Sequence, residues 1–132
     1  MSYVINQSRK LLITQLKSEL NYRLMMISMR MQLTGMKSAD ITKQKAEIQN
    51  AQMEKLVANG AENITLQDVQ NVAAMTSDLD VQLELLSIQD ENMEAEMRMI
   101  ETELNTLNAE DEQLDKAIDS SVKKEFGIFS SN

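Results

Sequence analysis

The chain contains no cysteine, no histidine, no tryptophan and no proline. Without cysteine and histidine it has no thiol nucleophile, no imidazole base and none of the usual ligands of structural zinc. Disulfides are excluded too, so cysteine usage says nothing about the redox compartment. Proline is absent and only three of the 132 residues are glycine, so little interrupts a helix. These absences remove the commonest catalytic chemistries and favour long helices.

Aromatic residues are also scarce, with two tyrosines and two phenylalanines. A compact core in a domain of this length normally uses more of them. The chain is instead rich in Leu, Met, Glu, Gln, Lys and Ala, a composition typical of coiled coils and long bundles. It has neither an apolar run long enough to span a membrane nor a secretory signal. We therefore expect no membrane span. If the protein leaves the cell, we expect leaderless export; a cytoplasmic location stays open.

Charge is divided unequally along the chain, whose net charge is −8. Residues 1–60 carry nine Lys or Arg and four Asp or Glu, a net charge of +5. Residues 61–132 carry four Lys or Arg and seventeen Asp or Glu, a net charge of −13. An acidic protein is a poor partner for nucleic acid, so none is expected. A basic half and an acidic half are expected to pack against each other.

The clearest local signal is a helix end followed by a helix start in "KLVANGAENITLQDVQ". The Asn-Gly pair at 59–60 supplies a residue that tolerates the left-handed conformation after a helix. Thr65 is placed as an N-cap, with Asp68 as the acid of a capping box. Ile64 and Val69 are spaced for a hydrophobic staple. The pattern predicts a turn at 60–65.

This turn separates two arms of similar length, 3–59 and 66–126. A short connection favours antiparallel neighbours, so we expect an all-α fold, a long antiparallel helical hairpin that forms a single domain over 1–132. Facing residue numbers should then add up to about 125. That register places Asp115 opposite Lys10, places Asp111 between Lys10 and Lys17, and brings two methionine clusters together.

The second arm carries a heptad pattern over many turns. Its d positions are Leu79, Leu86, Met93, Ile100, Leu107 and Leu114. Its apolar a positions are Leu83, Met97, Leu104 and Ile118. Asp90 and Asp111 also occupy a positions, where a polar residue either sets the register or marks a widened, exposed seam; both interpretations stay open.

The first arm carries an apolar stripe from Ile13 to Met31. Gly35 either breaks this arm, with Ser38 as a new N-cap, or is tolerated inside one helix at about 1 kcal/mol relative to alanine. The residues predicted to form the core between the arms are Leu16, Leu20, Ile27, Met31, Met93, Met97, Ile100, Leu104 and Leu107.

The methionines and acidic residues raise the question of a metal or catalytic site. The stretch from Tyr22 to Lys37 holds five of the eleven methionines, and thioether clusters can bind Cu(I). Methionine also fills irregular cores and adaptable surfaces, and without His or Cys we favour that interpretation. An EF-hand loop starting at Asp78 would have Leu83 where a glycine is required. No nucleophile–base pair is visible, so we expect no metal, no cofactor and no enzyme activity.

Apolar residues exceed what one stripe per helix can bury, and such a surplus indicates an interaction surface. The residues predicted to contact other subunits are Leu12, Met25, Met29, Leu33, Val122, Phe126 and Phe129. A repeated contact that does not close on itself produces a filament.

Two stretches carry a resemblance. "MSYVIN" is similar to the opening of flagellins, and "QLDKAIDSSVKKEFGIF" resembles the closing helix of type III secretion needle subunits. The ending is also similar to that of small bacterial coiled-coil proteins without an assigned function. The resemblance to flagellins and needle subunits implies a Cys-free helical hairpin that assembles through amphipathic ends.

We therefore expect a structural subunit that self-assembles into a filament or tube and is exported, with itself and an export apparatus or chaperone as partners. The alternative is a helical adaptor or export chaperone whose methionine-rich face receives a partner helix.

Overall fold

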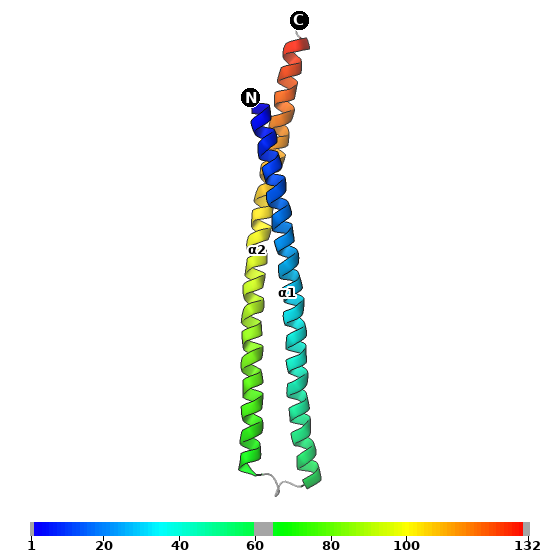
Figure 1. Cartoon of the computed structure of the whole chain (residues 1–132), viewed down its shortest axis with the longest axis vertical. Helices are drawn as coiled ribbons and strands as arrows, with labels where there is room; N and C mark the ends of the chain where they lie inside the picture. The colour runs from blue at the N-terminus through cyan, green and yellow to red at the C-terminus, as the bar shows by residue number, and fades with distance from the viewer. Residues whose placement is uncertain (1, 60–64, 131–132) are drawn as a thin grey trace. The chain divides into compact units, whose positions relative to one another are not determined.

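The computed structural model describes the backbone of residues 2–59 and 65–130, and the side-chain surroundings of residues 3–58 and 65–125. Two helices make up this part of the chain, α1 (Ser2–Asn59) and α2 (Leu66–Ser130) (Figure 1). No strand occurs among these residues. The fold is an all-α helical hairpin, as the sequence predicted.

Gly35 does not break α1, which runs without interruption from Ser2 to Asn59. A Cβ atom added at Gly35 would meet nothing within 4 Å, so no close approach requires a glycine there. Thr34 and Thr42 donate hydrogen bonds to carbonyl oxygens four residues earlier, as threonines inside a continuous helix do. Of the two alternatives for this position, the tolerated glycine is therefore correct.

The second arm extends further than the predicted end at 126, because α2 continues to Ser130. The predicted arm ends at the residue before Gly127. A glycine permits the left-handed conformation that ends a helix but does not impose it. The backbone here stays helical through Gly127, and the predicted boundary was wrong by four residues.

The start of α2 is the predicted capping box. The Asp68 backbone N–H donates to Thr65 Oγ1 at 3.2 Å, and the Thr65 N–H donates to Asp68 Oδ2 at 3.4 Å. The N–H groups of Asp68 and Val69 also reach the Thr65 carbonyl. The reciprocal bonds satisfy donors that the first helical turn leaves without partners. Gly60 and Ile64 of the predicted turn lie outside the described residues.

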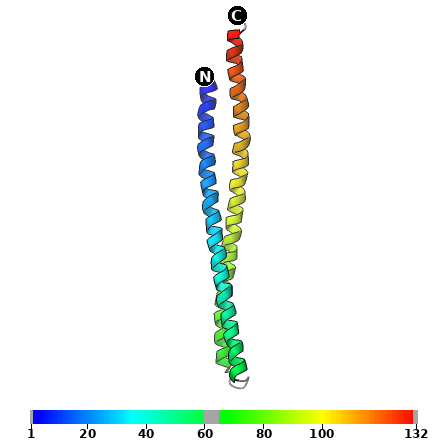
Figure 2. The same ribbon diagram turned by 90° about the vertical axis from the view of Figure 1, so that its right-hand side faces the viewer.

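The chain divides into two compact units, and a single domain over 1–132 stays a prediction. Unit 1 comprises Met1–Ile27 with Ala95–Asn132, and unit 2 comprises Ser28–Glu94. Each unit pairs a segment of α1 with a segment of α2 (Figure 2). The segments of unit 1 are antiparallel, since Arg9 pairs with Glu110 while the later Arg23 pairs with the earlier Glu96.

On both helices, the residues that are buried or half-buried recur mostly at alternating steps of three and four. The heptad seam predicted for α2 is therefore confirmed. Ile13 is the most buried, at 1% exposed. The other buried residues among those described are Leu20, Ile27, Thr34, Leu79 and Ile100. The predicted core residues that lie half-buried along the seam are Met31, Met93, Met97, Leu104 and Leu107.

Leu16 is a correction to the predicted core, because 38% of it is exposed. The seam of α1 passes from Ile13 to Lys17 and then to Leu20, which leaves Leu16 on its flank. A lysine can fill such a position because its aliphatic stem packs while its amine reaches a polar partner. Lys10 and Lys45 occupy the same heptad position as Lys17 and are likewise half-buried.

Candidate interaction surface

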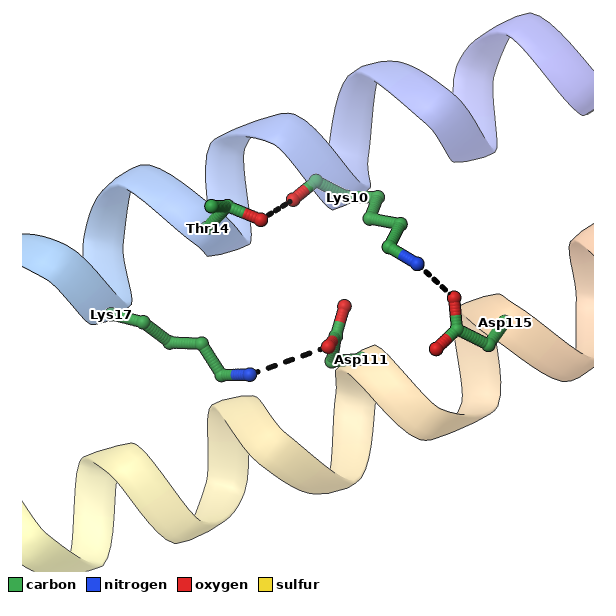
Figure 3. A network of polar contacts seen from close by, with 5 residues as sticks. All are labelled: Lys10, Thr14, Lys17, Asp111 and Asp115. Carbon is green, nitrogen blue, oxygen red and sulfur yellow. Dashed lines mark hydrogen bonds and ion pairs between the residues drawn. The ribbon is translucent and has the colours of Figure 1, made fainter.

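Charged residues line part of the seam in unit 1 (Figure 3). Lys10 forms an ion pair with Asp115, and Lys17 Nζ lies 3.3 Å from Asp111 Oδ2. On the α1 side, Thr14 Oγ1 donates a hydrogen bond to the Lys10 carbonyl oxygen at 2.9 Å. Asp111 thus lies between the levels of Lys10 and Lys17, where the predicted register placed it, and Asp115 meets Lys10.

Asp111 depends on Lys17 for compensation of its charge. Both side chains are only 24% exposed, and Asp111 Oδ1 is inaccessible and has no hydrogen-bond partner. A carboxylate in this position is costly unless a cation lies close to it. Asp90, at the equivalent heptad position in unit 2, is half-buried and takes part in none of the ion pairs described here. A register-setting role for the two residues stays a prediction.

The lysine nearest Asp115 is held strongly in its charged form. The hydrogen bond to Asp115 raises the pKa of Lys10 above its ordinary value of 10.5. Partial removal from water acts in the opposite direction, while the negative charges of Asp115, Asp111 and Asp119 raise this pKa further. Lys10 therefore keeps its charge, and with it the ion pair, to more alkaline pH than a free lysine.

Each of the five interhelical ion pairs described here joins a base on α1 to an acid on α2. Besides the two lysine pairs, Arg9 meets Glu110 at 3.3 Å and Arg23 meets Glu96 at 3.6 Å. In unit 2, Lys45 Nζ lies 2.6 Å from Asp80 Oδ1. The prediction that the basic and acidic halves pack against each other is confirmed. Exposed pairs contribute about 0.2–1 kcal/mol each, so they select the pairing of the arms more than they stabilise it.

The residues predicted to contact other subunits lie mostly outside the seam. Leu12 and Met25 of unit 1 are exposed, and so are Met29 and Leu33 of unit 2. Val122 is half-buried. The side chains of Phe126 and Phe129 fall outside the described surroundings. The four exposed residues add nothing to the core of the hairpin, so they remain available as contact surface.

The methionines divide between seam and surface. Met31, Met93 and Met97 are half-buried at seam positions, where a flexible thioether fills space. The exposed methionines among the described residues are Met25, Met29, Met36, Met53, Met75 and Met99. Within the described residues, no group of three or more His, Cys, Asp or Glu could hold a metal ion.

A further exposed apolar row, which is not among the predicted contact residues, lies on α2 in unit 2. It consists of Val81, Leu85 and Ile88, all about half exposed. Their spacing of four and then three places them on one face of the helix, away from the seam residues Leu83 and Leu86. In the sequence this row is a second set of apolar residues with helical spacing, separate from the a and d positions of the seam.

No protein-family model matches the chain, and it matches no curated protein and no solved structure. In the helical residues that the structure describes, no stretch is apolar enough to cross a membrane.

Proposed function

We propose that this protein is a structural subunit that self-assembles through helix packing into a filament or tube. One observation carries the proposal: large apolar side chains stay exposed on the outer faces of both helices, although the seam already has its own apolar row. Folded chains that act alone seldom expose contiguous apolar patches. A copy of the same chain is an occupant that is always present at matching concentration.

The energies are adequate for such an association. Burying one large apolar side chain contributes about 1.5–3 kcal/mol. Association costs about 4–15 kcal/mol in lost translational and rotational freedom, so a contact of several such residues is required. The exposed residues of α1 supply that number in each unit; in unit 1 they include Val4, Ile5, Leu11 and Leu12. The similarity of the closing stretch to needle subunits is the ground for placing the assembly outside the cell.

The test is the particle distribution of the purified full chain. Negative-stain microscopy and light scattering, over a range of protein and salt concentrations, should show elongated particles that grow with concentration. Monodisperse small particles under every condition would overturn the proposal. Leu12→Glu should reduce assembly without loss of helicity, because Leu12 is exposed. Val57→Glu is the matched control, since Val57 is 85% exposed and outside the predicted contact surface.

An adaptor or chaperone function is the second candidate, and a groove in unit 1 favours it. Leu16, Leu20 and Leu107 line this groove together with Arg23 and Glu103. An amphipathic partner helix could place its apolar face there. A monodisperse small oligomer that binds an amphipathic helical peptide, with loss of binding in Leu16→Glu, would support this function over assembly.

A further inference from the structure

Unit 2 carries an exposed apolar row on each of its two helices. The α1 stripe consists of Met29, Leu33 and Met36, which are 52%, 57% and 69% exposed. The α2 stripe consists of Val81, Leu85 and Ile88. Each stripe has steps of four and then three residues, so its members share one helix face. The seam residues of α1 and α2 occupy other faces, so both stripes remain exposed, although Leu33 and Leu85 also border grooves between the helices.

The two stripes lie in segments of opposite charge. Residues 28–39 of α1 contain Arg30 and Lys37 and no acid. Residues 78–91 of α2 contain five acids and no base. Of these acids, Glu84 and Glu91 take part in none of the ion pairs described above. A basic apolar face and an acidic apolar face are complementary surfaces.

The bases beside the α1 stripe are not neutralised across their own seam. In unit 1, Arg9 and Arg23 hold the corresponding heptad position, and each has a glutamate partner on α2. In unit 2, the groove beside Arg30 is lined on α2 by Gln89, and the groove beside Lys37 by Gln82 and Gln89 of α2 and by Asp40 of α1 itself. Because glutamines stand where unit 1 has acids, the charges of Arg30 and Lys37 remain available to a partner.

Building on the self-assembly proposed above, we infer that the α1 stripe of one copy packs against the α2 stripe of a second copy. The contact pairs Met29, Leu33 and Met36 with Val81, Leu85 and Ile88. Charge complementarity favours this pairing over contact between two α1 stripes, which would bring Arg30 and Lys37 of both copies together. The spacing of the two stripes is identical, so their side chains can interdigitate over two turns.

Charge placement also selects the direction of the two helices. In a parallel coiled coil, the residue just before an a position of one helix lies beside the residue just after a d position of the other helix. Within the two stripes, Leu85 takes the a position and Met36 takes a d position. Lys37 follows Met36, and Glu84 precedes Leu85. A parallel contact with the stripes level therefore brings Lys37 to Glu84. An antiparallel contact would instead bring Lys37 to the uncharged Gln82 and Gln89.

This contact joins two different surfaces of the same chain. Each copy presents one stripe of each kind, so a bound copy still has a free stripe for the next. Such a heterologous contact repeats until it closes into a ring or continues as a filament.

Two blocking variants test the inference. Leu33→Glu disables the α1 stripe and Leu85→Glu disables the α2 stripe; both sites are more than half exposed, so circular dichroism should show unchanged helicity. By sedimentation velocity, each variant alone should lose most of the species above the monomer. Mixed one to one, they should form a heterodimer, because one intact contact remains between them. Val57→Glu serves as the control and should assemble like the unmodified chain.

The alternative outcomes are distinct. If the unmodified chain assembles and both variants assemble equally, the inference is overturned and the proposed function stands. If only Leu33→Glu loses assembly, the contact joins two α1 stripes and the inference is again wrong. An unmodified chain that never assembles overturns the proposed function itself. In a charge-swap test, Lys37→Glu and Glu84→Lys should each weaken assembly several-fold and restore it in the doubly substituted chain; failure to restore would contradict the parallel arrangement.

Discussion

Lys17 reaches across the seam of unit 1 to Asp111, whose second carboxylate oxygen has no hydrogen-bond partner. The pair replaces apolar packing at one level of an otherwise largely apolar α2 seam. Removing one partner of such a pair is more harmful than removing both, because the remaining charge keeps its desolvation cost.

Lys17→Leu should therefore destabilise the hairpin by about 1–3 kcal/mol, since it leaves Asp111 half-buried and unpaired. Lys17→Leu combined with Asp111→Leu should recover that loss or exceed the stability of the unmodified chain. Urea unfolding followed by circular dichroism measures both. Equal losses in the single and double variants would show that the pair contributes through its attraction rather than through compensation of a buried charge.

Alkaline pH should release the stabilisation that Lys10 provides. Its pKa is raised in the folded chain, so the contribution is complete below its ordinary value of 10.5 and is lost as pH rises through the raised value. The melting temperature should fall more steeply above pH 10.5 in the unmodified chain than in Lys10→Gln. Lys43→Gln, at an exposed position of α1 outside the ion pairs described here, should retain the steep fall. Superimposable curves for all three proteins would count against this role.

The capping box at the start of α2 should contribute measurably to stability. Thr65→Ala removes the oxygen that accepts the Asp68 N–H and should cost about 1 kcal/mol, whereas Thr65→Ser keeps it and should cost little. Thr102→Ala is the control, because the exposed Thr102 hydroxyl caps no helix end. It donates to the Arg98 carbonyl oxygen inside the helix. Thermal unfolding distinguishes the three; no difference between Thr65→Ala and Thr65→Ser would show that the cap is dispensable.

Gly35→Ala should stabilise the chain by about 0.5–1 kcal/mol. The glycine lies inside α1, and a methyl group there would meet nothing within 4 Å. The matched reverse change is Ala39→Gly, at an exposed position four residues later, which should destabilise by a similar amount. A loss of stability in Gly35→Ala would mean that this position needs a conformation or contact that only glycine allows.

Local sequence signals predicted the hairpin well where a motif is compatible with only one structure. Thr65 and Asp68 together predicted the start of α2. The short connection then predicted a register in which Lys10 lies opposite Asp115. The heptads of α2 could be followed because its d positions are apolar throughout. On α1, lysines hold seam positions, so the apolar count favoured Leu16 where the structure uses Lys17. The α2 stripe that begins at Val81 was not predicted, because a surface row of apolar residues can be told from a seam row only when the seam has been located.

The lysines of the α1 seam have one more consequence, which concerns slippage. A seam of apolar residues alone looks the same after one arm slides by seven residues, because the heptad repeats. Lys17 would then face the level of Leu104 or Ile118 instead of Asp111, and Lys45 would face Ala73 or Ser87 instead of Asp80. In unit 1 a slide keeps only one of the two lysine pairs, because Lys17 takes the place of Lys10 beside Asp115 or Lys10 takes the place of Lys17 beside Asp111. In unit 2 either slide removes Lys45 from Asp80. The lysines thus interrupt the repeat of the seam, and a single register of the two arms is favoured over those shifted by one heptad.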